Sequence, residues 1–320
     1  MPVSPAFEQP YTFIGRQSRL MDSATTEGFL MEREGLSQRL TQKEQSAARE
    51  LQAALPDWRD PTAGLERFKA LSAGFRQRFE RTTFLNINKF VVVDLMPRLE
   101  EAIASRNIPD EILAMYPSAT SRLLAYVRNL SDHEYFDPDD AFLKDLRFAS
   151  GLSVPSRGAQ DIDLRSAIGY RASARWLLRH PSARYVRAVV RWRQVAPWFR
   201  IHTQSRYLDD FNEAGFDACY FHLAALLPLH PEVLGLASTS WLYDPQLESI
   251  SPRLTYIRLR PVERGASIVW SGTTDFDIRS ATLKSANRRR LYAEGKYTPV
   301  SYTLLWPREE ILMWADAQRL

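Results

Sequence analysis

A change of pattern between residues 150 and 160 constrains the fold of this chain most. Before it, apolar residues recur at the spacing of amphipathic helices; the clearest case is residues 65–84, whose apolar face holds Leu65, Phe68, Leu71, Phe75 and Phe79. After it, helical stretches alternate with short runs of β-branched and aromatic residues, which are typical of strands. Ser, Gly and Pro at the change indicate a linker. The sequence therefore predicts an α+β protein, with a helical N-terminal half packed on a C-terminal mixed α/β half with a central sheet.

The same pattern divides the chain into three regions. Residues 1–22 are expected to form an extended arm, residues 23–150 a mainly helical region, and residues 151–320 an α/β region that holds the candidate site. No stretch reaches about eighteen consecutive apolar residues, and the first residues lack the apolar core of a signal peptide. We therefore expect a cytoplasmic protein with no membrane partner.

Charge and cysteine content limit the function classes. The chain has 42 Lys and Arg residues against 38 Asp and Glu residues, and a net charge of only +4 is weak support for nucleic-acid binding. We therefore expect no nucleic-acid partner. Cys219 is the single cysteine, so an intrachain disulfide is impossible. It lies in an apolar helical pattern, which favours a core thiol over a nucleophile.

Individual segments carry their own patterns. Strands are expected at 185–192, 197–203, 234–242, 252–260, 267–271 and 302–306, and helices at 165–178, 216–229 and 279–294. Residues 90–93 fit either a buried strand or a buried helix, because periodicity cannot decide a run this short. Residues 252–260 alternate between an aliphatic face and a face with Tyr256 and Arg258, so these two side chains are expected to point outward together.

The stretch from Ser240 to Pro245 places polar and aromatic side chains at the end of a predicted strand. In open α/β sheets, ligands bind beyond the carboxyl ends of strands, so this position suits a site. His202 stands at the end of another predicted strand, where a rigid element opens into a loop. We expect His202, Tyr243 and Asp244 to be the catalytic residues; for His202 the alternative is a hydrogen-bonded structural histidine.

Further residues are expected to bind the substrate. Tyr256 and Arg258 are suited to an anionic or amide group, although the alternative is a solvated sheet face. Arg288 and Arg289 belong to an arginine triplet that serves either to bind a cofactor phosphate or to stabilise the end of a helix. No metal site is assigned. The full set of predicted substrate-binding residues is His222, Ser240, Trp241, Arg253, Tyr256 and Arg258.

Two resemblances extend these expectations. The chain resembles an uncharacterised bacterial protein family in the run from Ser240 to Arg258 and in Arg288-Arg289-Arg290-Leu291-Tyr292, Gly295, Tyr297, Pro299 and Trp306-Pro307-Arg308. This resemblance implies a module from about residue 150 to the end of the chain. It implies no activity.

The second resemblance is to the GNAT acyltransferase superfamily. Residues 240–247 are similar to a Ser-Trp-Leu-x-Asp-Pro-Gln-Leu motif in a domain associated with that fold, and Asn287, Tyr292 and Gly295 fall where such enzymes often carry Asn and Tyr-x-x-Gly. The resemblance implies a coenzyme A-type acyl donor. Residues 261–266 are similar to the loop that holds its pyrophosphate, which normally continues with a second glycine and a helix. Here residues 267–270 follow, and they favour a strand.

These features favour a small-molecule biosynthetic enzyme over the alternatives. The expected reaction is acyl transfer to an amine or an amino-acid-like substrate in a pocket lined by some of the eight tryptophans and thirteen tyrosines. One alternative is a metal-dependent enzyme that uses His202, His222 and Asp244 or Asp210. The other is a non-catalytic binding protein whose N-terminal helices associate. If the chain associates with itself, a homodimer is expected.

Overall fold

The N-terminal half of the protein is helical. The computed structural model describes residues 20–55, 61–129, 135, 141–166, 178, 197–204, 206 and 208–318. The predicted arm, the predicted helix at 165–178 and the predicted strand at 185–192 lie almost wholly outside these residues. The helices before the sheet are α1 (Ser23–Arg39), α2 (Gln42–Ala53), α3 (Pro61–Arg78), α4 (Arg81–Leu95), α5 (Leu99–Ala104), α6 (Asp110–Leu113), α7 (Tyr116–Arg128) and α8 (Ala141–Ala149).

Helix α4 forms the centre of this half. Val91, Val92 and Val93 are fully buried in it, so the ambiguous run at 90–93 is helical. It packs against α1, α2 and α8. A β-branched run is stable in a helix when tertiary packing buries every side chain, because burial outweighs the small propensity cost.

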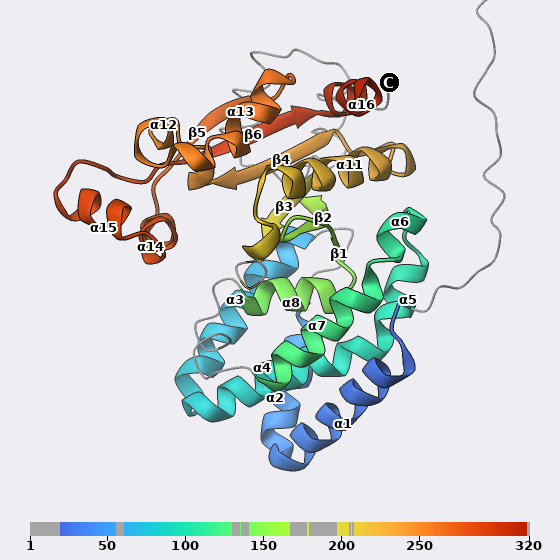
Figure 1. The fold of residues 1–320 in the computed structure, drawn as a ribbon. Helices are drawn as coiled ribbons and strands as arrows, with labels where there is room; N and C mark the ends of the chain where they lie inside the picture. Colours follow the sequence, from blue (N-terminus) through green and yellow to red (C-terminus); the bar gives the residue numbers. More distant parts are fainter. Residues whose placement is uncertain are drawn as a thin grey trace, which may run out of the picture.

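A six-stranded mixed sheet forms the C-terminal half, which confirms the predicted α+β arrangement. The strand order is β1-β2-β3-β4-β6-β5, and only β3 and β4 are parallel. Figure 1 shows the N-terminal helices on one side of the molecule, with α8 next to β1, β2 and β3. The strands are β1 (Ser153–Pro155), β2 (Gln160–Ser166), β3 (Trp198–Thr203), β4 (Gly235–Ser240), β5 (Ser267–Gly272) and β6 (Ser301–Pro307).

Some of the C-terminal helices cover one face of the sheet, and others lie beyond one of its ends. Tyr220 of α11 and Trp314 of α16 both pack against Trp306 of β6, with ring centroids 5.1 and 5.6 Å away. The pair α14 and α15 projects from the end of the sheet (Figure 1). No described helix is both long and apolar enough to cross a membrane. These helices are α11 (Glu213–Leu229), α12 (Leu247–Ile250), α13 (Tyr256–Glu263), α14 (Asp275–Leu283), α15 (Ala286–Ala293) and α16 (Arg308–Ala317).

Two predicted elements are wrong. The strand predicted at 252–260 is instead a 3₁₀ turn (Pro252–Leu254) followed by α13. The antiparallel neighbour of β4 is β6, and not the segment at 252–260. Pro252 opens the 3₁₀ turn, and Ile257 and Pro261, four residues apart, are buried on one helical face. The single helix predicted at 279–294 is two helices, because the Ser285 side chain accepts from the Arg288 N–H and starts a new one.

The parallel strands β3 and β4 end at the same edge of the sheet. Phe199 and Leu236 are paired in their register. Two residues further on, the Ser238 hydroxyl donates to the Ile201 carbonyl at 3.3 Å. His202 and Thr239 therefore lie near the carboxyl ends of adjacent parallel strands, at the edge where open α/β folds bind ligands.

Candidate functional site

His202 forms a pair with a buried carboxylate on the neighbouring strand. Its Nε2 lies 2.6 Å from Oδ2 of Asp163, and the Asp163 side chain is fully buried. Asp163 also accepts from Nε of Arg147 at 2.9 Å, with a second nitrogen of the same guanidinium at 2.8 Å. His202 and Asp163 share one face because they lie on adjacent antiparallel strands, two register positions apart.

The charges around Asp163 decide its protonation state. Burial acts to raise the pKa of Asp163, but Arg147 and His202 outweigh it and hold the pKa at about 2. The pKa of His202 is lowered, chiefly by burial, although Asp163 opposes that shift. At neutral pH the pair is therefore an ionised carboxylate beside a neutral imidazole.

This pairing fixes the tautomer of His202. An ionised Asp163 can only accept, so the neutral imidazole carries its proton on Nε2 and donates it. The other ring nitrogen, Nδ1, keeps its lone pair and has no partner among the described residues. With a quarter of its side chain exposed, His202 is within reach of a ligand. A histidine oriented in this way by a carboxylate is a general base, as in catalytic triads.

Helix α8 supplies the layer that covers this face. Its Arg147, whose side chain is mostly covered, reaches Asp163, and its buried Lys144 donates to the Thr203 carbonyl at the end of β3. Asp145, from the same helix, accepts from Tyr135 and from Arg206, which follows β3. The helical half therefore builds one wall of the site.

A cavity of about 220 Å³ is lined by Asp161 and Gln204; His202 is not part of its lining. We call it the Asp161 cavity, after the residue directly opposite His202 in the strand register. Directly opposite residues have Cβ atoms about 4.5–5.5 Å apart, so Asp161 and His202 are neighbours. Asp161 accepts from the Gln204 amide, and its other oxygen has no partner among the described residues. The apolar part of the lining is Met115, Ala119, Leu123 and Phe148, and Arg122, Arg157 and Asp210 complete the charged part.

Burial raises the pKa of Asp161 to about 6, against an ordinary value of 3.8. The nearby Asp145 adds to the rise, while Gln204, Lys144 and Arg206 oppose it. Keeping this carboxylate ionised at neutral pH costs free energy. Carboxyl groups with a raised pKa are common at functional sites.

Replacing Asp161 by asparagine is therefore expected to stabilise the fold by up to about 3 kcal/mol at pH 7, because a raised carboxyl pKa penalises the ionised native state. The penalty grows as pH rises from about 4 to 6 and is absent below that range. Asparagine keeps an acceptor for Gln204. Urea unfolding of both proteins at pH 7 and pH 4 measures the effect; a variant less stable than the parent at pH 7 would contradict it.

The turn before Asp161 is held in an unusual conformation. Gly158 and Ala159 have positive φ angles of 74° and 60°, and Ala159 is the single non-glycine residue with positive φ among the described residues. A side chain on Gly158 would meet the backbone of Gly215 in α11, so this contact fixes the turn. Backbone strain of this kind persists where the surroundings impose it, and it is frequent at binding sites.

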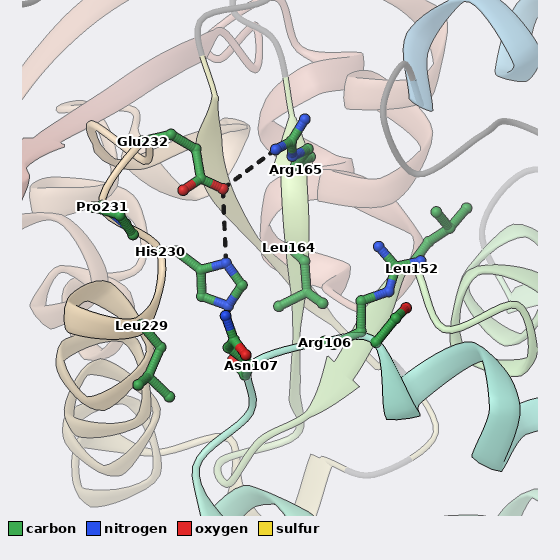
Figure 2. Close-up of a pocket in the computed structure, with 10 residues that line it drawn as sticks. Arg106, Asn107, Leu152, Leu164, Arg165, Leu229, His230, Pro231 and Glu232 are labelled. Carbon is green, nitrogen blue, oxygen red and sulfur yellow. Dashed lines mark hydrogen bonds and ion pairs between the residues drawn. The ribbon is translucent and has the colours of Figure 1, made fainter. Parts of the chain in front are cut away.

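A second cavity, of about 300 Å³, lies at the opposite ends of β3 and β4 (Figure 2). There Arg165 donates to Glu232 at 3.2 Å, and His230 lies 2.8 Å from the Asn107 carbonyl. The pKa of Glu232 is lowered to about 2, mainly by its hydrogen bond to His230. The polar groups of these side chains form hydrogen bonds within the wall of the cavity.

Tyr243 is buried, and no contact between it and His202 is found among the described residues; Asp244 has other partners. Burial raises the pKa of Tyr243 to about 12, so its hydroxyl stays protonated, and Arg200 acts on both Tyr243 and Asp163. Asp244 instead accepts from the N–H groups of Gln246 and Val300 at 3.0 and 3.1 Å. It ties the loop after β4 to the chain before β6.

Trp241 and Arg288 form a separate group at the end of the sheet. The Arg288 guanidinium lies 4.9 Å from the Trp241 ring and donates to the Ala281 carbonyl and to Ser251 Oγ, at 2.6 and 2.9 Å. The adjacent Ser240 hydroxyl accepts from the Leu242 N–H and starts a 3₁₀ turn. These contacts fix α14 and α15 to the loop that follows β4.

The remaining predicted residues are dispersed. His222 is buried in α11, where its Nδ1 lies 2.8 Å from Ser156 Oγ, and burial lowers its pKa to about 4. Arg258 lies on α13, the helix found in place of the predicted strand, and forms an ion pair with Glu248 of α12. Tyr256 packs edge-on against Phe216 with ring centroids 5.6 Å apart. Arg253 and Arg289 are exposed. Among the described residues, no hydrogen bond or ion pair joins His202 to Tyr243 or Asp244.

Neither the loop at 261–266 nor the N-terminus of α11 forms a place for the pyrophosphate of coenzyme A. The loop at 261–266 leads into strand β5, not into a helix. The N-terminus of α11 is capped by Asn212, and Asp209, Asp210 and Glu213 around it would repel an anion. Within the described ranges, no group of three or more His, Cys, Asp or Glu side chains is placed to hold a metal ion.

Sequence reasoning missed Arg147, Asp161 and Asp163. The alternation in residues 160–166 places both aspartates on one face of a strand, and this signal could have identified them. Arg147 gave no such signal, because its role depends on where α8 meets the sheet.

Comparison with known proteins yields little similarity. No protein-family model matches the chain, and no curated protein matches it. A solved structure of an acyltransferase in complex with decanoyl-CoA is similar to this chain with a TM-score of 0.45 and 15% sequence identity, over 81% of this chain and 74% of that chain. A likeness this distant carries no argument about the reaction, which has to come from the residues of the chain itself.

Proposed function

We propose that this protein is a transferase that moves an acyl group from a thioester to the amine of a small molecule, with His202 as the general base. The supporting observation is the His202–Asp163 pair near the carboxyl end of β3, at the edge where β4 also ends. The amine substrate enters from the Asp161 cavity, where Asp161 lies opposite His202 in the strand register. The motif at 240–247, which resembles acyltransferases, follows β4 at the same edge of the sheet.

The chain's own residues account for the proton transfers. The amine nitrogen attacks the carbonyl carbon, and its proton passes to Nδ1 of His202 while Asp163 stabilises the imidazolium that forms. The carbon–sulfur bond then breaks, and the departing thiolate takes a proton from His202. An amine and a thioester thus give an amide and a thiol, and the imidazole returns to its neutral form.

The donor is a coenzyme A-type thioester that is recognised at its acyl and thioester end. Neither the loop at 261–266 nor the N-terminus of α11 fits the pyrophosphate, so the nucleotide part contributes little binding energy in this proposal. Acyl-pantetheine and acyl-coenzyme A with the same acyl group are therefore expected to react with similar kcat/KM.

The test is replacement of His202 by glutamine. We expect kcat/KM to fall about 10²–10⁴-fold, the usual contribution of a general base. Acetyl, hexanoyl and decanoyl thioesters are offered with a panel of amines and amino acids, and amides are detected by mass spectrometry. His230→Gln is the matched control, because that histidine belongs to the other cavity and should keep parental activity. No amide from any pair, or equal activity of parent and His202→Gln, would refute the proposal.

A further inference from the structure

The Asp161 cavity combines carboxylates with cationic and apolar groups. Three aspartates line it, and one of them, Asp210, is exposed to water. Within the cavity, Asp145 is occupied by Tyr135 and Arg206, whereas Asp161 has one oxygen without a partner among the described residues. A buried carboxylate in this state is stabilised by a cation that donates hydrogen bonds to it. An ammonium group meets both requirements.

Two arginines also line the cavity. Arg157 is exposed on the turn that lines the cavity, and Arg122 of α7 lies on the same lining. A guanidinium presents paired N–H groups that match the two oxygens of a carboxylate. The cavity therefore offers complementary partners to a ligand that carries both charges.

Size and the apolar wall narrow the class of ligand. The volume of 220 Å³ equals the share of about seven waters in the liquid, so the cavity suits a small molecule. Its apolar wall comes from Met115, Ala119 and Leu123 of the α6–α7 region and from Phe148 of α8. Such a wall favours an aliphatic side chain over a charged one.

We infer that the Asp161 cavity binds a small α-amino acid with an aliphatic side chain, its ammonium group against Asp161 and its carboxylate towards Arg157. The inference rests on the proposed function in one respect, because it identifies this amino acid as the acyl acceptor. The ammonium group first releases one proton to water, and the amine that results lies near His202, the residue opposite Asp161. His202 then takes the second proton as the amine attacks.

Binding to three matched probes tests the inference without any donor. L-leucine, 3-methylbutylamine and 4-methylpentanoate share one aliphatic chain and differ in which charged groups they carry. Calorimetric titration of the full chain should show L-leucine binding at least tenfold more tightly than either analogue. Equal affinities for the three probes, or no saturable binding of L-leucine, would overturn the inference.

Two variants assign the charged partners. Asp161→Asn should abolish the advantage of L-leucine over 4-methylpentanoate, and Arg157→Gln should abolish its advantage over 3-methylbutylamine. Asp161→Asn is expected to be at least as stable as the parent, so its loss of binding cannot reflect unfolding. Arg165→Gln, in the other cavity, should keep parental affinities. A ratio of affinities unchanged in Asp161→Asn would contradict the assignment.

The outcomes separate this inference from the proposed function. Selective binding of L-leucine without amide formation from any thioester would retain the amino-acid site and refute acyl transfer. Amide formation with amines that lack a carboxylate, at the same kcat/KM as with L-leucine, would retain acyl transfer and refute the amino-acid specificity.

Discussion

Replacing Asp163 by asparagine is expected to lower the free energy of unfolding by about 3–5 kcal/mol at pH 7, because it leaves Arg147 buried without its counter-ion. The Arg147 side chain is only 12% exposed and that of Asp163 is fully buried, so water cannot replace the lost partner. The lowered pKa also fixes the sign of the pH dependence. Ionised Asp163 stabilises the fold above about pH 4, and this contribution is lost as pH falls towards 2.

Chemical unfolding between pH 2 and 7 measures this effect. The difference between parent and Asp163→Asn should be constant above about pH 5 and should shrink below about pH 4. Asp217→Asn is the matched control, because Asp217 also contacts two arginines, Arg260 and Arg264, but its side chain is 27% exposed. Exposed pairs contribute about 0–1 kcal/mol, so the control should change little. Equal losses in the two variants would contradict the role given to burial.

Replacing Gly158 by alanine is expected to cost about 3–5 kcal/mol, since two penalties add at this position. Its φ of 74° is unfavourable for any residue with a Cβ atom, and that atom would lie 2.7 Å from the Cα of Gly215. Neither backbone is free to shift, because Gly215 belongs to α11 and Gly158 to the turn that leads into β2.

Gly295 provides a control with the same backbone strain and no collision. Its φ is 66°, and a Cβ atom added to it would have no other atom within 4 Å. Gly295→Ala should therefore cost only about 1–2 kcal/mol, the conformational penalty alone. Thermal and urea unfolding of both variants give the comparison, and a Gly158→Ala protein as stable as Gly295→Ala would disprove close packing of the turn on α11.

The fold class could be predicted because it depends on local pattern. The stripe that begins at Leu65 and the short runs at 197–203 and 302–306 each carry one clear periodicity, and the structure confirms a helix at the first and strands at the others. The prediction failed at 252–260, where alternation of Leu254, Tyr256 and Arg258 also fits a short helix. Over so few residues, proline position and tertiary packing decide between the two.

The site was less predictable because its residues are far apart in the sequence. His202 and Tyr243 could be chosen, since each stands at the end of a recognisable strand or just after one. Asp244, Trp241 and Arg288 have the same residue types as catalytic or binding groups, but they hold loops and helices together. Which role a polar residue takes depends on the partners that the fold brings to it, such as Arg147 to Asp163.

The salt bridge from Arg147 to Asp163 has a consequence for how such a protein could arise by recombination. His202, the carboxylate that orients it and the arginine that keeps this carboxylate ionised come from both halves of the chain. An α/β half transferred alone to another gene would lose Arg147, and with it the charge state on which His202 depends. We therefore expect the two halves to have been inherited together rather than separately.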